Sequence, residues 1–206
     1  DLRRRDLTVN AMARGADGII VDPFDGREDL DAGLLRHVSP AFVEDPLRVL
    51  RIARFAAKLG RHGFHVAHAT HRLLVEMVRR GDMAQLTRER LWREMSRAMA
   101  TGQPWRFFEV LHRCGALAEL IPPLAVRLGE PAAHRDRPDV APVAALKQAT
   151  RVTAEPVVRL AAALYSCAAT PAEADRLTAE LRADRETAQL LHRVINANAQ
   201  LAGAAR

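Results

Sequence analysis

The spacing of apolar residues predicts a mainly α-helical chain with a few short strands near its N-terminus. From Ser39 onward, apolar positions recur every three or four residues, which is the period of one helix face. Helices are expected at about 44–59, 67–80, 88–100, 105–114, 116–121, 143–151, 156–168 and 172–199. Thr87 is expected to cap the third helix, and the last is expected to break near Asp184. Residues 129–142 are rich in Pro, Asp, His and Arg and predict a loop or hinge.

The N-terminal part follows a different pattern, with short apolar runs separated by glycines and turn residues. Residues 7–13 predict a first buried helix. The β-branched run at 19–21 predicts a strand, and residues 24–30 predict a turn with a helical kink. Residues 34–38 predict a second strand that pairs back with the first. Two strands alone are marginal, so the sheet is expected to continue upstream of this sequence.

The first long helix is expected to carry a ladder of charge. Asp45, Arg48, Arg51 and Arg54 follow one another at intervals of three, while the apolar residues between them form a separate arc. A carboxylate only accepts hydrogen bonds and a guanidinium only donates them, so Asp45 beside Arg48 presents one edge of each kind. We therefore expect these two side chains to project from one side of the helix toward a concavity shared with Arg51 and Arg5.

Two interpretations of this ladder remain open from the residues alone. In the first, Asp45 and Arg48 read a base, because cytosine and adenine both place an amino donor beside a ring-nitrogen acceptor, whereas guanine and uracil present the reverse. Arg51 and Arg54 would then hold a triphosphate, since planar guanidinium groups match phosphate oxygens. In the second, the ladder is a solvated helix face stabilised by ion pairs of roughly 0.2–0.5 kcal/mol each.

Composition adds a preference for an acidic partner. The 206 residues are 49% hydrophobic and 27% charged, which is typical of a globular protein with one or two packed units. An excess of 31 Lys and Arg over 25 Asp and Glu gives a net charge of +6, which favours RNA or a nucleotide. Cys114 and Cys167 lack metal-type spacing and are expected to be free buried thiols. Nothing resembles a signal peptide or a membrane span, so the sequence predicts a cytoplasmic protein without a membrane partner.

Histidines, arginines and aromatic residues supply three further candidates for function. Four histidines lie at intervals of three from His62 to His71, but a glycine and a phenylalanine inside the run make a metal site the less favoured interpretation. The arginines between 79 and 90 predict a solvated helix surface, with contact to an RNA backbone as the alternative. The aromatic residues at 92, 105, 107 and 108 recur at helical spacing, which favours the core over an RNA-stacking platform.

Three segments in a fixed order carry a family resemblance. They are Arg-Arg-Asp-Leu-Thr-Val-Asn-Ala-Met at 4–12, Asp-Pro-Phe-Asp-Gly-Arg-Glu-Asp-Leu at 22–30, and the longer segment at 35–57 that contains Glu-Asp-Pro-Leu-Arg. Together they resemble the class II tRNA nucleotidyltransferases, the family of bacterial CCA-adding enzymes and poly(A) polymerases. The likeness continues through residues 90–94 and 107–117 and covers more than half of the chain. Several long matches in order make chance resemblance very improbable.

The resemblance implies a role for each residue of the ladder. The implied nucleotide-binding residues are Arg4, Arg5, Asp6, Asn10, Asp45, Arg48, Arg51 and Arg54. In the family, the Arg-Arg-Asp motif contacts the nucleotide sugar and phosphates, the aspartate–arginine pair selects C or A, and the later arginines hold the triphosphate. CTP and ATP are the implied substrates and tRNA the implied partner.

The segment from Asp22 to Leu30 resembles the element that reorients the family's site between C and A addition. Asp22, Gly26 and Asp29 are its implied residues in this chain. The family usually shows two glycines where this chain has Asp25 followed by Gly26. Loss of one glycine is expected to stiffen the turn.

Two departures from the family concern chemistry. Family members carry an Asp-x-Asp that binds metal upstream of the arginine motif, and this sequence begins after that point. Because two-metal phosphoryl transfer needs those ligands, Mg²⁺ is expected to be held outside this chain, with no catalytic or metal-binding residue inside it, and the chain alone is expected to be inactive. Close relatives also continue into a His-Asp phosphohydrolase region. Here Tyr165 and Ser166 stand where that dyad would fall, so no hydrolase activity is expected.

The sequence therefore predicts a mainly α fold with a helical neck and body and a small β remnant of a nucleotidyltransferase head. The expected division is 1–38 for the end of the head, 39–101 for a base-recognising neck and 102–206 for the body. The expected function is CCA addition to tRNA as the downstream part of the enzyme. A bacterial poly(A) polymerase and a catalytically inactive RNA- or nucleotide-binding module are the alternatives, and the oligomeric state stays open.

Overall fold

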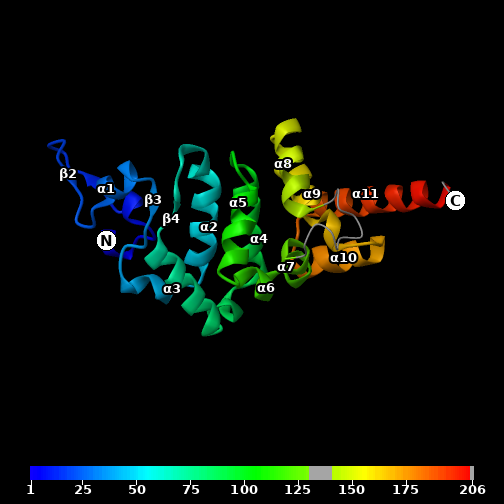
Figure 1. Ribbon diagram of the computed structural model, residues 1–206, viewed down its shortest axis with the longest axis horizontal. Coiled ribbons are helices and arrows are strands. Elements are labelled where there is room, and N and C mark those ends of the chain that lie inside the picture. Colours follow the sequence, from blue (N-terminus) through cyan, green and yellow to red (C-terminus); the bar gives the residue numbers. More distant parts are fainter. Residues whose placement is uncertain (130–140, 205–206) are drawn as a thin grey trace.

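The computed structural model describes residues 1–129 and 141–204, and within these ranges the chain is mainly α-helical, as predicted. Figure 1 shows the elements in an elongated row, with the N-terminal strands at one end and the last helix, α11 (Arg185–Ala204), at the other. No helix in the described part of the chain is long and apolar enough to cross a membrane. The loop expected at 129–142 lies almost wholly outside the described residues.

The N-terminal elements are short. They are the 3₁₀ turns η1 (Leu2–Arg4), η2 (Thr8–Asn10) and η3 (Pro40–Glu44), the strands β1 (Ala13–Arg14), β2 (Ile20–Val21) and β3 (Leu34–Leu35), and the helix α1 (Gly26–Asp31). The buried helix predicted at 7–13 is wrong, because only one 3₁₀ turn forms before β1 pairs antiparallel with β2.

The predicted pairing of the two N-terminal strands is also wrong. β3 pairs in parallel with β4 (His65–Val66), a strand that follows the first long helix in the sequence. Burial explains the choice of partner, since Leu35 of β3 is completely buried, whereas both residues of β2 are exposed. The apolar side chain of β3 is therefore drawn to the core, and β2 remains in a small outlying hairpin.

The long helices agree closely with the sequence pattern. The remaining elements are α2 (Leu47–Leu59), η4 (Gly60–His62), α3 (His68–Arg79), η5 (Asp82–Gln85), α4 (Arg88–Met99), α5 (Trp105–Arg113), α6 (Ala116–Leu120), α7 (Pro122–Gly129), α8 (Pro142–Val152), α9 (Pro156–Leu164), η8 (Tyr165–Cys167) and α10 (Pro171–Glu180). The side chain of Thr87 caps α4 by accepting the backbone N–H of Arg90, as predicted. α7 was not predicted, although prolines at its first positions suit a helix start.

One continuous apolar core links these helices, and α2 lies at its centre. The predicted apolar arc of α2 is confirmed, since Val49, Leu50, Ile52 and Ala53 are all completely buried. The other core members include Phe42, Leu74, Met77, Leu91, Met95, Phe107, Phe108, Leu160, Leu164 and Leu191. Trp92 is also buried, which confirms the core interpretation for three of the four aromatic residues, whereas Trp105 is half-buried. Both cysteines are free, as predicted, and Cys114 is buried, whereas Cys167 is only partly buried.

A buried arginine that the sequence pattern did not single out connects α9 with the ends of α4 and α8. The guanidinium of Arg159, on α9, donates to the carbonyl oxygens of Met99 and Thr101 after α4, and to those of Thr150 and Thr153 at the end of α8. Backbone carbonyls at helix ends lack helical partners and carry partial negative charge. The single cation therefore satisfies the ends of two helices at once.

The turn before α1 contains Asp25, at the position where the family resemblance implies a glycine. Asp25 adopts the left-handed conformation, with φ of 56°, which an aspartate tolerates better than most residues. Gly26 has a different requirement, since a Cβ there would lie 2.3 Å from the backbone oxygen of Thr8. The carboxylate of Asp22 accepts the backbone N–H groups of Gly26 and Arg27, and these hydrogen bonds lower the pKa of Asp22. The turn is thus fixed by local polar contacts as well as by packing.

Candidate functional site

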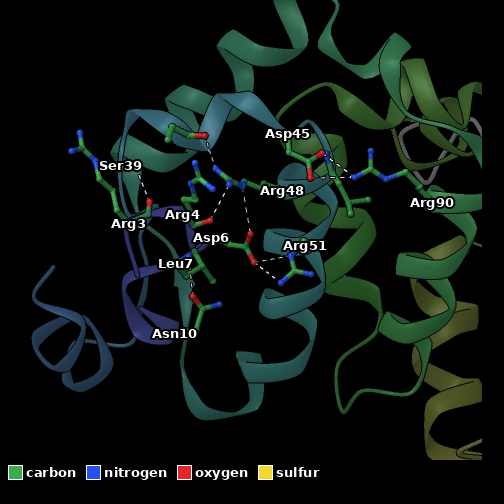
Figure 2. A network of polar contacts seen from close by, with 12 residues as sticks. Arg3, Arg4, Asp6, Leu7, Asn10, Ser39, Asp45, Arg48, Arg51 and Arg90 are labelled. Carbon is green, nitrogen blue, oxygen red and sulfur yellow. Dashed lines mark hydrogen bonds and ion pairs between the residues drawn. The ribbon is translucent and has the colours of Figure 1, made fainter. Parts of the chain in front are cut away.

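A buried carboxylate joins the N-terminal segment to α2. Asp6 follows η1 and is almost completely buried. Its Oδ2 atom accepts a hydrogen bond from Nε of Arg51 and pairs with Nη2 of the same guanidinium, and both N–O distances are 2.6 Å. Its Oδ1 atom lies 3.6 Å from Nε of Arg48. Figure 2 shows this carboxylate between the two arginines, one helical turn apart on α2. The structure therefore brings together Asp6, Arg48 and Arg51, three of the residues expected to bind a nucleotide.

The Arg48 guanidinium is held by backbone carbonyls from two parts of the chain, η1 and η3. Nη1 donates to the carbonyl of Ala41 in η3 at 2.5 Å, and Nη2 donates to the carbonyl of Arg4 at 2.9 Å. Only 12% of the side chain is exposed, and its Cζ atom lies 5.8 Å from the centre of the Phe42 ring. Each terminal nitrogen of a guanidinium carries two hydrogens, so one N–H on each remains for a further acceptor. Arg48 is a donor whose position is fixed before any ligand binds.

Asp45 lies beside Arg48 but not in the helical ladder that the spacing predicted. Its backbone is extended, with φ of −131° and ψ of 107°, and α2 begins only after Pro46. The Oδ1 atom accepts the backbone N–H of Leu47 at 3.0 Å. Nη2 of Arg90, on α4, donates to both carboxylate oxygens, at 3.0 and 3.1 Å. The Asp45 carboxylate, which is the hydrogen-bond acceptor, therefore lies in the turn that precedes α2.

Arg54 points away from this network. Its Nε atom donates to Oε2 of Glu94 at 2.6 Å, and the Glu94 side chain is only 3% exposed. The Arg54 guanidinium also lies 4.8 Å from the centre of the Phe55 ring, and Arg97 provides a second, more exposed partner for the carboxylate. The structure therefore connects Arg54 to the α2–α4 interface rather than to Asp6.

The remaining expected nucleotide ligands lie at the N-terminal edge of the network. The side chains of Arg4 and Arg5 are exposed, and Arg4 lines an open depression of about 780 Å³ between η1 and η3. The Oδ1 atom of Asn10 accepts the backbone N–H of Leu7, which closes the 3₁₀ turn η2. Asn10 thus has a local structural role in this conformation.

The residues of the expected flexible element are tied to the same N-terminal segment. Asp29 is buried and accepts the hydroxyl of Thr8 at 2.7 Å and Nε of Arg36 at 2.9 and 3.0 Å. Gly26 packs directly against the backbone of Thr8. Through Thr8, α1 is therefore connected to the chain segment that carries Asp6, two residues earlier.

Within the described ranges, no three His, Cys, Asp or Glu side chains are grouped so that they could hold a metal ion. His65, His68 and His71 do share a groove of about 650 Å³ with Arg36, which follows β3, and with two arginines of α5. These imidazole and guanidinium groups do not fit a catalytic Mg²⁺, which prefers oxygen ligands.

His37 makes the N-terminal packing sensitive to pH. Its backbone N–H donates to the Thr70 hydroxyl, its Nδ1 lies 2.9 Å from the same oxygen, and its ring contacts Phe42 edge to face. Burial, assisted by the charge of Arg36, lowers the pKa of His37 below 6.5. A lowered pKa stabilises the fold above the unfolded-state value, and this contribution is lost as the pH falls through the folded-state value.

We therefore expect the thermal unfolding midpoint to fall on going from about pH 7.5 to about pH 5.5, and His37→Gln to show a smaller fall. Circular dichroism melts of both proteins at the two pH values would measure this difference. An equal fall in both proteins would assign the pH dependence to other groups.

Two family profiles match the chain on either side of α2. A profile described as "Poly A polymerase head domain" matches residues 1–36. A profile described as "Probable RNA and SrmB- binding site of polymerase A" matches residues 63–128. The segment that contains Asp45, Arg48 and Arg51 lies between the two matched ranges.

Individual proteins are similar to this chain over most of its length. It is 45% identical over 196 residues to the "Multifunctional CCA protein" of Thioalkalivibrio sulfidiphilus, covering 93% of this chain and 48% of that protein. Among solved structures, a "tRNA-processing enzyme (apo form I)" matches with a TM-score of 0.72 at 24% identity, covering 95% of this chain and 52% of the other. A "tRNA nucleotidyltransferase complexed with a primer tRNA and an incoming ATP analog" matches with a TM-score of 0.65 at 25% identity, covering 92% and 56%. The chain spans about half the length of the curated relative it matches.

Proposed function

Because the chain belongs to the class II CCA-adding enzyme and poly(A) polymerase family, we propose that it is the downstream part of an enzyme that transfers CMP and AMP from CTP and ATP to the 3′ end of tRNA. The observation that carries this proposal is that Arg48, a donor fixed by two backbone carbonyls, and Asp45, a carboxylate acceptor, lie three residues apart at the start of α2. Residues 1–38 would be the end of the head, 39–101 the neck that reads the base, and 102–206 the body.

The geometry supports selection of C and A through hydrogen-bond direction. An amino group of cytosine or adenine would donate to the Asp45 carboxylate, while the neighbouring ring nitrogen would accept a free N–H of Arg48. Guanine or uracil would place a carbonyl against the carboxylate and an N–H against the guanidinium. Two mismatched edges would then lose both hydrogen bonds and leave buried polar groups unsatisfied.

The phosphates would be held by the basic residues around Asp6. Arg51 uses Nε and Nη2 for Asp6, which leaves its Nη1 available, and the exposed side chains of Arg4 and Arg5 lie on the neighbouring segment. We assign Arg54 to the α2–α4 interface instead, because its partner is the buried Glu94. The element from Asp22 to Asp29 would reorient the site between C and A addition.

Transfer itself is proposed to depend on Mg²⁺ ligands outside this sequence. In such enzymes the ion stabilises charge that develops on the transferring phosphoryl group. Since the described residues offer no matching carboxylate cluster, we expect this chain alone to bind nucleotides without transferring them. A poly(A) polymerase is the second candidate, because both matching profiles name that enzyme. The Ser-Pro-Ala-Phe segment at 39–42 favours the tRNA enzyme.

Calorimetry with the four ribonucleoside triphosphates tests the base-reading site in this chain. We expect weak binding of CTP and ATP and at least tenfold weaker binding of GTP and UTP, since one or two hydrogen bonds to charged groups are at stake. Asp45→Ala should remove this preference without preventing folding, because 39% of the side chain is exposed. Equal affinity for all four nucleotides in the unaltered chain would contradict the base-reading proposal and favour a general RNA- or nucleotide-binding module.

A further inference from the structure

The Asp45 carboxylate has one side-chain partner in the described part of the chain, and that partner, Arg90, lies on α4. Arg90 lies in the first turn of α4, and its own backbone N–H is held by the Thr87 cap. Figure 2 shows its guanidinium approaching Asp45 from the side opposite Arg48. The sequence predicted a solvated surface for this arginine, with RNA backbone contact as the alternative. Its contact with Asp45 points to another role.

We propose that Arg90 is a positioning residue for base selection, which holds the Asp45 carboxylate in the orientation that reads the amino group of C or A. This inference rests on the proposed function. Without Arg90, Asp45 would keep one hydrogen bond, from the backbone N–H of Leu47 to Oδ1. A half-exposed carboxylate held at one oxygen can rotate about its Cβ–Cγ bond, so its acceptor edge would no longer have a single direction.

The contact geometry also indicates which oxygen reads the base. Oδ1 accepts two N–H groups, from Leu47 and Arg90, whereas Oδ2 accepts only Arg90 within the described residues. Each carboxylate oxygen can accept about two hydrogen bonds. Oδ2 therefore retains an open acceptor position, and we assign it as the acceptor for the amino group of the incoming base.

The helix arrangement explains why α4 can perform this task. α4 packs against α2, and its residues Leu91 and Met95 belong to the same buried core, so the Arg90 backbone is fixed relative to the start of α2. A site that must distinguish two polar edges needs side chains whose own positions are fixed by neighbours. Arg48 is fixed by carbonyl oxygens of η1 and η3, and Arg90 would provide the equivalent support for Asp45.

The test compares CTP and UTP binding by calorimetry in the full 206-residue chain and five variants. Arg90→Ala should reduce the CTP-to-UTP affinity ratio about tenfold, because it removes the charge-assisted contacts that orient Asp45. Arg90→Lys should restore most of the ratio, since an ammonium can still donate to Oδ2. Arg97→Ala is the matched control, because it removes another paired arginine of α4 and should leave the ratio unchanged. Combining Arg90→Ala with Asp45→Asn should lower the ratio no further than Asp45→Asn alone.

The outcomes separate this inference from the function on which it rests. If the unaltered chain binds CTP and UTP equally, the base-reading function and the role of Arg90 both fail. If it prefers CTP and Arg90→Ala keeps that preference, the role of Arg90 alone is overturned. A uniform gain in affinity for both nucleotides in Arg90→Ala would also overturn it, since that result would mean that Arg90 blocks the site. Unchanged unfolding midpoints in circular dichroism melts would show that a lost preference is not caused by a lost fold.

Discussion

Arg54→Ala should lower the free energy of unfolding by about 3–5 kcal/mol, because it leaves the buried carboxylate of Glu94 without its main partner. The Nε–Oε2 distance is 2.6 Å, and the two side chains are 16% and 3% exposed, so little water reaches the pair. Urea denaturation followed by circular dichroism would measure the loss. Arg97→Ala should cost less than about 1 kcal/mol, because Arg97 is the exposed partner of the same carboxylate.

A paired replacement tests whether the effect comes from an isolated buried charge. Arg54→Met combined with Glu94→Leu should recover most of the lost stability, since apolar residues of similar size often replace a buried ion pair at little cost. If Arg54→Ala instead unfolds like the unaltered chain and weakens binding of every nucleotide, then Arg54 serves the triphosphate, as the sequence pattern suggested.

Arg54 also shows the limit of what a helical pattern can predict. The intervals of three correctly predicted which side of α2 is apolar, because helix periodicity is a local property of the chain. The same intervals could not reveal that the last arginine of the ladder faces Glu94, which lies 40 residues further along. Partners of charged side chains depend on how helices pack, and that information is not contained in one helix.

The start of the ladder was misplaced for a more local reason. Proline is favoured in the first turn of a helix, and this suggested that the acidic pair before it also belonged to the helical face. In the structure η3 ends at Glu44, and Asp45 is extended and caps the turn with its own carboxylate. Asp45 and Arg48 both lie at the beginning of α2, but the Asp45 carboxylate contacts Arg90, whereas the Arg48 guanidinium contacts Ala41 and Arg4. A concavity that these two side chains share with Arg51 and Arg5 therefore stays a prediction.

Around Asp6, the sequence predicted which residues would lie together but not the contacts that they make. The Arg-Arg-Asp motif predicted a group of side chains near α2, yet it gave no sign that the carboxylate of Asp6 would pair with both Arg48 and Arg51. Likewise, the family resemblance implied a flexible element around Gly26, but the close approach of the Thr8 backbone to Gly26 can be seen only in the tertiary structure. Contacts between segments distant in sequence are the part that a single sequence leaves open.

The sharpest test of the proposed enzyme compares two arginines that stand one turn apart on α2. In a protein that joins this chain to the upstream part of a relative, Arg48→Ala should reduce the preference for C and A over U and G by about 1–3 kcal/mol, or roughly 5- to 150-fold. Arg48 offers its free N–H groups to the base edge, so its loss leaves Asp45 as the sole reader. Arg51→Ala should weaken the binding of all four nucleotides by the same factor, because the phosphates are the same whichever base is attached.

Primer extension on a tRNA that ends before CCA, with each nucleotide supplied separately, would measure both effects. Ratios of kcat/KM between nucleotides cancel any general loss of folded protein, which matters because Arg48 also anchors the carbonyls of Ala41 and Arg4. Arg51→Ala serves as the matched control, since it also removes a partner of Asp6. An Arg48→Ala protein that retained full selectivity for C and A would show that the base is read elsewhere, and a selectivity loss in Arg51→Ala instead would move the base-reading position one turn along the helix.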